Sequence, residues 1–169
     1  MNNYISNQSQ QFEGKVIIVT GSTQGSGAET AKLFAARGAK AITICGRQEN
    51  KGAEIKKEIE DLGSKCLFVK ADLSKVEDCK KIVELTDKEF GTVHSLVNVA
   101  GYTERGTILS TTLENYEKNF SVNARAPFIL IQEVVKIMIR DKNKGTIANL
   151  LSMAMYSGMP FLTAYSGSK

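Results

Sequence analysis

The chain has 169 residues, of which 42% are hydrophobic and 24% charged, and its net charge at pH 7 is +4. This length and composition predict one soluble domain in the cytoplasm. The sequence lacks the basic, aromatic-rich stripe of a nucleic-acid-binding protein, and it lacks an apolar segment long enough to span a membrane. The three cysteines lack a C-x-x-C pair, which argues against a disulfide framework and a metal site.

The amino-terminal part combines a leader, a strand and a glycine-rich loop. Residues 1–13 are mostly polar and predict a flexible leader, so the folded domain is expected over residues 14–169. Residues 15–20 are apolar and β-branched, as in a buried parallel strand. A glycine-rich loop and a helix over residues 28–38 follow, and this order predicts a phosphate site at the helix N-terminus. The loop residues expected to contact a cofactor are Gly21, Thr23, Gln24, Gly25, Ser26 and Gly27.

The remaining sequence repeats the alternation of strand and helix. The expected strands are 41–45, 66–71, 95–99 and 146–151, and the expected helices are 48–62, 76–90 and 119–140. Such alternation predicts an α/β fold with a Rossmann-like, doubly wound parallel sheet. Ligands of these sheets bind at the carboxyl ends of the strands.

The last residues predict acid–base chemistry. Tyr165 and Lys169 are four positions apart, so on one helix their side chains would lie on the same face. A free tyrosine has a pKa of about 10, and a nearby ammonium group typically lowers such a pKa by about 1–3 units. Ser152 offers a hydroxyl that could hold a substrate oxygen while the proton moves. An exposed helix with a snorkelling lysine would give the same spacing.

From Gly14 onward the chain resembles the short-chain dehydrogenases/reductases of the classical type, and within them the 3-oxoacyl-acyl-carrier-protein reductases. The glycine loop after Thr20 is similar to the cofactor loop of that family, although Ser26 replaces its usual isoleucine. Residues 98–101 are similar to its Asn-Asn-Ala-Gly motif, with Val99 in place of the second asparagine. Four further residues match the order and spacing of its catalytic tetrad: Asn123, Ser152, Tyr165 and Lys169.

The resemblance implies an oxidoreductase that moves hydride between a nicotinamide cofactor and a carbonyl or secondary alcohol. Tyr165 would donate or remove the proton, Ser152 would polarise the substrate oxygen, and Lys169 would lower the pKa of the tyrosine and hold the nicotinamide ribose. Asn123 would anchor a water of the proton relay. The resemblance adds a further set of cofactor contacts, in which Asp72 would meet the adenine: Asp72, Leu73, Asn98, Ala100, Gly101, Tyr165 and Lys169.

One local feature bears on Asn123 independently. Pro127 lies four residues later and has no N–H, so the Asn123 carbonyl loses its usual helical partner. An oxygen freed in this way can bind water, and an ordinary proline kink would have the same sequence.

Charge indicates which cofactor is preferred. An acidic residue about 20 positions after the glycine loop holds the ribose of NAD, whereas an arginine there accommodates the 2′-phosphate of NADP. Arg47 occupies that position after Gly46, which favours NADP. Gln24 stands where many NADP-dependent relatives carry a second basic residue.

Members of the family usually continue through two more strands and a segment that covers the substrate. The chain therefore resembles a C-terminally truncated member, and the 169-residue piece is expected to have little or no activity. A non-catalytic NADP-binding sensor or interaction module, or an inactive fragment, is the alternative. The helix expected over 119–140 is apolar on nearly every face, which predicts a homodimer or homotetramer.

The substrate would be a small carbonyl or alcohol of unspecified class. A group of apolar side chains after Ser152 either lines its site or packs in the core: Met153, Met155, Met159 and Phe161.

Overall fold

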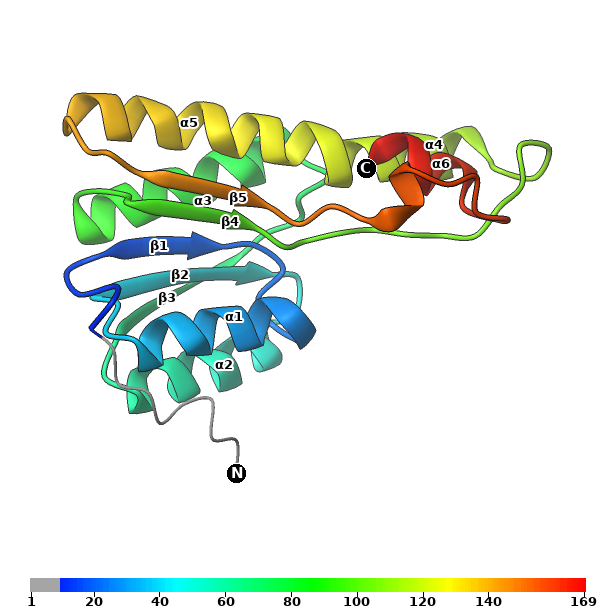
Figure 1. The fold of residues 1–169 in the computed structure, drawn as a ribbon. Helices are drawn as coiled ribbons and strands as arrows, with labels where there is room; N and C mark the ends of the chain where they lie inside the picture. The colour runs from blue at the N-terminus through cyan, green and yellow to red at the C-terminus, as the bar shows by residue number, and fades with distance from the viewer. Residues whose placement is uncertain (1–9) are drawn as a thin grey trace.

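A computed structural model describes residues 10–169 as a parallel sheet flanked by helices (Figure 1). The strands are β1 (Val16–Val19), β2 (Ala41–Gly46), β3 (Lys65–Lys70), β4 (Ser95–Asn98) and β5 (Thr146–Asn149). The helices are α1 (Gly25–Ala36), α2 (Glu49–Asp61), α3 (Val76–Phe90), α4 (Leu113–Phe120), α5 (Ala126–Arg140) and α6 (Thr163–Ser168).

The sheet has the strand order β3-β2-β1-β4-β5, and every pairing is parallel. The order therefore reverses at β1, which pairs with β2 on one side and with β4 on the other. This is the Rossmann-like α/β fold that the sequence predicts. A crevice for ligands forms at such a reversal, at the carboxyl ends of the strands.

The core lies on both faces of the sheet, because successive side chains of a strand point to opposite sides. Ile17 and Val19 of β1 pack with α1 and α2, whereas Ile18 packs with α3 and α5. All three are fully buried. Figure 1 shows the same division, with α1 and α2 below the sheet and α5 above it. Continuous apolar runs in β1 and β2 follow from this burial on both faces.

The segment expected as one helix over residues 119–140 is longer and irregular. It begins at Leu113, where the Thr112 hydroxyl accepts a hydrogen bond from the Asn115 N–H over 3.1 Å. A π-helical turn over Ser121–Arg125 joins α4 to α5. Pro127 stands in the first turn of α5 and cannot donate to the Asn123 carbonyl, so a regular α-helical ladder is interrupted here.

Strand β5 differs from the buried strands. It ends at Asn149 rather than at the expected residue 151, and all four of its residues are exposed. Within residues 10–169 it pairs with β4 alone. The segment that carries Ser152 therefore follows the least covered strand of the sheet.

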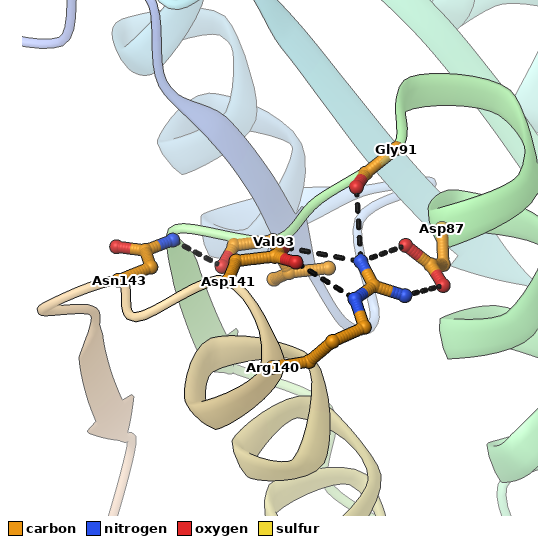
Figure 2. Close-up of polar contacts among 6 residues, drawn as sticks. All are labelled: Asp87, Gly91, Val93, Arg140, Asp141 and Asn143. Carbon is orange, nitrogen blue, oxygen red and sulfur yellow. Dashed lines mark hydrogen bonds and ion pairs between the residues drawn. The ribbon is translucent and has the colours of Figure 1, made fainter.

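A polar network lies at the amino-terminal ends of β4 and β5, at the end of the sheet opposite to the ligand crevice (Figure 2). Arg140 at the end of α5 donates to both carboxylate oxygens of Asp87 in α3, over 2.7 and 2.9 Å, and to the Gly91 carbonyl over 3.0 Å. Hydrogen bonds to Asp87 and Asp141 raise the pKa of Arg140. The network ties α3 to α5 and stays away from the carboxyl ends of the strands.

The predicted leader, residues 1–13, lies mainly outside the described residues. Its last residues contact the domain: the Phe12 ring packs edge-on against Phe34 with centroids 4.7 Å apart, and Glu13 forms a bridge with Ala39. The boundary at residue 14 stays a prediction. Between residues 10 and 169, no helix is long and apolar enough to cross a membrane.

Candidate active site

The glycine loop lies against the turn that follows β4. Gly21 has φ +63°, and a Cβ atom there would be 2.7 Å from the Ala100 Cα. A Cβ atom on Gly27 would be 2.3 Å from the Gly21 carbonyl oxygen. Both positions exclude a side chain, so the loop backbone packs closely and leaves its outer surface open to a ligand.

Two hydroxyl groups that sequence reasoning missed hold this arrangement. Thr20 Oγ1 accepts hydrogen bonds from the N–H groups of Val99 and Ala100, over 3.1 and 3.2 Å. Ser22 Oγ donates to the Val19 carbonyl over 2.6 Å and accepts from the Cys45 N–H over 3.0 Å. The ends of β1, β2 and β4 are thereby joined at one point. The signal was available, because both residues lie within three positions of the end of β1.

A cleft of about 360 Å³ opens at this end of the sheet. All the predicted cofactor contacts line it except Asn98, Tyr165 and Lys169. Its other lining residues were not predicted as cofactor contacts: Cys45, Gly46, Ala71, Val99, Tyr102, Lys118, Val122 and Leu150. Lys118, Val122 and Leu150 come from segments distant from the predicted contacts, so the sequence carried no spacing pattern that could identify them.

Asp72 and Arg47 face one end of the cleft. Burial would raise the pKa of Asp72, but hydrogen bonds from the Ser74 N–H and hydroxyl, together with the charge of Arg47, hold that pKa below its ordinary value. Asp72 is therefore anionic at neutral pH. Arg47 is exposed and Gly46 before it is half-buried.

Asn98 lies behind the cleft. Its Nδ2 donates to Asn149 Oδ1 over 2.9 Å and thereby joins the ends of β4 and β5. Its Oδ1 is buried and has no hydrogen-bond partner among the described residues. Asn98 instead lines a second cavity of about 210 Å³, together with Asn123, Ser168 and Lys169. Asn98 is thus placed to support the strand end and to face the catalytic segment.

Asn123 connects three parts of the site through its side chain. Its Oδ1 accepts from the Tyr102 N–H over 2.8 Å, and its Nδ2 donates to the Tyr102 carbonyl over 2.8 Å. The same Nδ2 donates to Ser168 Oγ over 2.9 Å. The side chain therefore fixes the turn after β4 and the end of α6, and Pro127 offers the Asn123 main-chain carbonyl no N–H.

Tyr165 lies in α6, and Lys169 directly follows the last residue of that helix. The Lys169 Nζ is 5.8 Å from the centre of the Tyr165 ring and donates to the Leu150 carbonyl over 3.0 Å. A Cβ atom on Gly101 would be 3.5 Å from the same Nζ. Lys169 is therefore placed between the tyrosine and the wall of the cleft.

Ser152 begins the short 3₁₀ turn Met153–Met155, where its Oγ accepts from the Ala154 N–H over 3.2 Å. Within residues 10–169 it shares no hydrogen bond with Tyr165 or Lys169. The structure thus brings together three of the four predicted catalytic residues, Asn123, Tyr165 and Lys169, through direct or one-residue contacts. Ser152 makes no hydrogen bond to these three residues, but the 3₁₀ turn that it begins packs against α6, the helix that carries Tyr165.

Comparison with known proteins identifies the family. The family model described as short chain dehydrogenase matches residues 15–169. The chain is 37% identical over 158 residues to an uncharacterised oxidoreductase of Thermotoga maritima, and the match covers 94% of this chain and 61% of the relative. It is 32% identical over 162 residues to galactitol 2-dehydrogenase of Agrobacterium fabrum, covering 94% and 60%.

A solved structure from Sinorhizobium meliloti, provisionally assigned as a short-chain alcohol dehydrogenase, is 28% identical. It superimposes with a TM-score of 0.88 over 95% of this chain and 63% of its own. The chain belongs to the short-chain dehydrogenase family. It spans about three fifths of the length of these relatives.

Proposed function

We propose that this chain forms the cofactor-binding and catalytic part of an oxidoreductase that interconverts a carbonyl and a secondary alcohol with NADP(H). The observation that carries the proposal is the position of Lys169, whose ammonium lies beside the Tyr165 ring and next to Gly101 of the cleft wall. An acid–base pair at the edge of a nucleotide-sized cleft is what this reaction requires.

The residues fit a dinucleotide. The positions at Gly21 and Gly27 admit no Cβ atom, and helix α1 begins at Gly25 with no side-chain cap from Gln24. The loop backbone can therefore approach a pyrophosphate, and the first N–H groups of the helix face it. Gly21, Thr23, Gly25, Ser26 and Gly27 would hold that group.

The bound nicotinamide would supply or accept the hydride. Tyr165 would give its phenolic proton to the substrate oxygen or remove it, and Ser152 would hold that oxygen through its hydroxyl. Lys169 would favour the phenolate by its positive charge. The main-chain carbonyl of Asn123 would hold a water that passes a proton between the solvent and Tyr165.

The preference for NADP(H) rests on Arg47. It lies at the carboxyl end of β2, lines the cleft and follows a glycine rather than an acidic residue. A guanidinium group suits a 2′-phosphate, whereas the ribose hydroxyl of NAD is usually held by a carboxylate.

The substrate is proposed to be a small molecule bound beside Ser152. Met153, Met155, Met159 and Phe161 are exposed among the described residues, so they do not pack in the core described here. We also propose that the whole protein works as a cytoplasmic homo-oligomer. The exposed Phe128 and Ile139 of α5 support an interface on that helix.

Tyr165→Phe tests the proposal, made in the chain together with any continuation that its gene encodes. We expect turnover of NADPH with carbonyl substrates to fall at least about 100-fold, since general acid–base catalysis contributes that much, while the cofactor dissociation constant stays unchanged. A parent protein that binds cofactor and never turns over would instead be a sensor or binding module.

A further inference from the structure

We propose that Lys51 in α2 is a second cation for the 2′-phosphate of NADP(H), acting beside Arg47 and through Gln24. This inference rests on the cofactor preference proposed above. It concerns the position where the glycine loop carries a neutral glutamine.

The primary observation is a contact between α2 and the glycine loop. Lys51 Nζ donates to Gln24 Oε1 over 2.7 Å, across 27 positions of the sequence. Gln24 lines the cleft. Because its oxygen is held by an ammonium group, its amide nitrogen is left to donate, and that nitrogen makes no hydrogen bond with the residues from 10 to 169. The contact with Lys51 thus leaves the Gln24 amide nitrogen free to donate to an anion bound in the cleft.

The Gln24 and Arg47 positions meet at one corner of the cleft. The Thr23 side chain fills the space beside Gly46, where a Cβ atom would be 2.6 Å from Thr23 Oγ1. Gln24 follows Thr23 and Arg47 follows Gly46. The contact between Thr23 and Gly46 therefore keeps Gln24 and Arg47 close to each other. Both line the cleft.

The lysines of α2 differ in how they are paired. Lys56 lies 3.7 Å from Glu60, and Lys57 lies 3.8 Å from Asp61. Lys51 has no acidic residue within salt-bridge distance in the described part of the chain. Its charge is therefore not neutralised by an ion pair at the point where α2 contacts Gln24, a residue of the cleft lining.

The acidic residue at the start of α2 is paired elsewhere. Glu49 pairs with Lys70 of β3 over 3.1 Å. Arg47, like Lys51, makes no ion pair within residues 10–169. The charge of Arg47 is felt by Asp72 in the same cleft, so a second cation that makes no ion pair would strengthen the attraction for a phosphate that carries close to two negative charges.

The experiment compares two probes that differ by one phosphate group, 2′,5′-ADP and 5′-AMP, by isothermal titration calorimetry at low salt. We expect Lys51→Ala to weaken 2′,5′-ADP binding about fivefold, the size of one partly exposed charge interaction, and to leave 5′-AMP binding unchanged. Lys51→Arg should keep most of the affinity. Lys57→Ala is the matched control on the same helix and should change neither value.

The outcomes separate this inference from the proposed preference. If the parent protein binds 2′,5′-ADP no more tightly than 5′-AMP, the preference for NADP(H) is wrong and the inference with it. If the parent prefers 2′,5′-ADP and Lys51→Ala keeps that ratio, Lys51 has no part in the subsite. An equal loss of both probes would show a structural role for Lys51 and would also overturn the inference.

Discussion

Asn123→Ala removes three hydrogen bonds that hold the turn after β4 and the end of α6 against the π-helical turn. Asn123 is 9% exposed, so water reaches this position poorly. The truncation leaves the N–H and the carbonyl of Tyr102 without the partner that both now share. It also frees Ser168 Oγ, which keeps its own bond to the Tyr165 carbonyl.

The expected cost follows from the two backbone groups of Tyr102. An unsatisfied buried polar group costs about 1–3 kcal/mol, and these groups are only partly buried. Taking the lower half of that range for each, Asn123→Ala should lower the free energy of unfolding by about 2–4 kcal/mol. This is a large share of a typical domain stability of about 5–15 kcal/mol.

Urea unfolding at pH 7 measures the loss, and hydrogen exchange at the Tyr102 amide localises it. Asn143→Ala is the control: it removes one side-chain bond, from Nδ2 to the Val93 carbonyl over 2.9 Å, and should cost about 1 kcal/mol. An Asn123→Ala protein within about 0.5 kcal/mol of the parent, with unchanged exchange at Tyr102, would refute the view that this side chain holds the site together.

Two further changes test the sheet and the loop. Gly27→Ala should abolish cofactor binding and lower the thermal midpoint by several degrees, because its Cβ atom would lie 2.3 Å from the Gly21 carbonyl oxygen; calorimetric binding equal to the parent would contradict this. His94 accepts a hydrogen bond from the Val16 N–H at Nδ1 over 3.0 Å, and burial, with the nearby lysine charges, lowers its pKa. The unfolded chain therefore takes up the proton first as the pH falls below about 6.5, and stability should fall with it. His94→Asn keeps an acceptor without titrating, so its urea midpoint should depend less on pH over that range than the parent's midpoint; equal slopes would exclude the effect.

Much of the fold could be predicted because its signals are local. The helix expected over residues 76–90 has those bounds in the structure, with a left-handed Gly91 at its end. The glycine loop was recognisable because Gly21 and Gly25 need a positive φ and Gly27 needs close contact, and both requirements restrict the residue type.

What the sequence could not give depends on contacts across the fold. The start of α4 at Leu113 had a usable signal in the Thr112 cap, but the π-helical turn after it depends on how Pro127 and Asn123 fit the neighbouring turn. The Lys51–Gln24 contact joins two elements with no sequence pattern between them. The sequence also could not predict that Ser152 makes no hydrogen bond to the other three predicted catalytic residues, since its position depends on the 3₁₀ turn that it begins.

The part of the site predicted to bind the cofactor is held more firmly than the part that carries Tyr165 and Lys169. The cofactor half rests on β1, whose four residues are fully buried, and on backbone contacts that admit no Cβ atom. The predicted catalytic half follows the exposed β5 and ends in α6, which packs against α4 and is also held by bonds from Asn123 to Ser168 and from Lys169 to Leu150. Only Ala164 and Ser168 of α6 are buried, and few buried contacts mean easy local opening, so cofactor binding should survive perturbations that displace the acid–base pair. We therefore expect a perturbation of β5 or α6 to lower turnover more than it weakens cofactor binding.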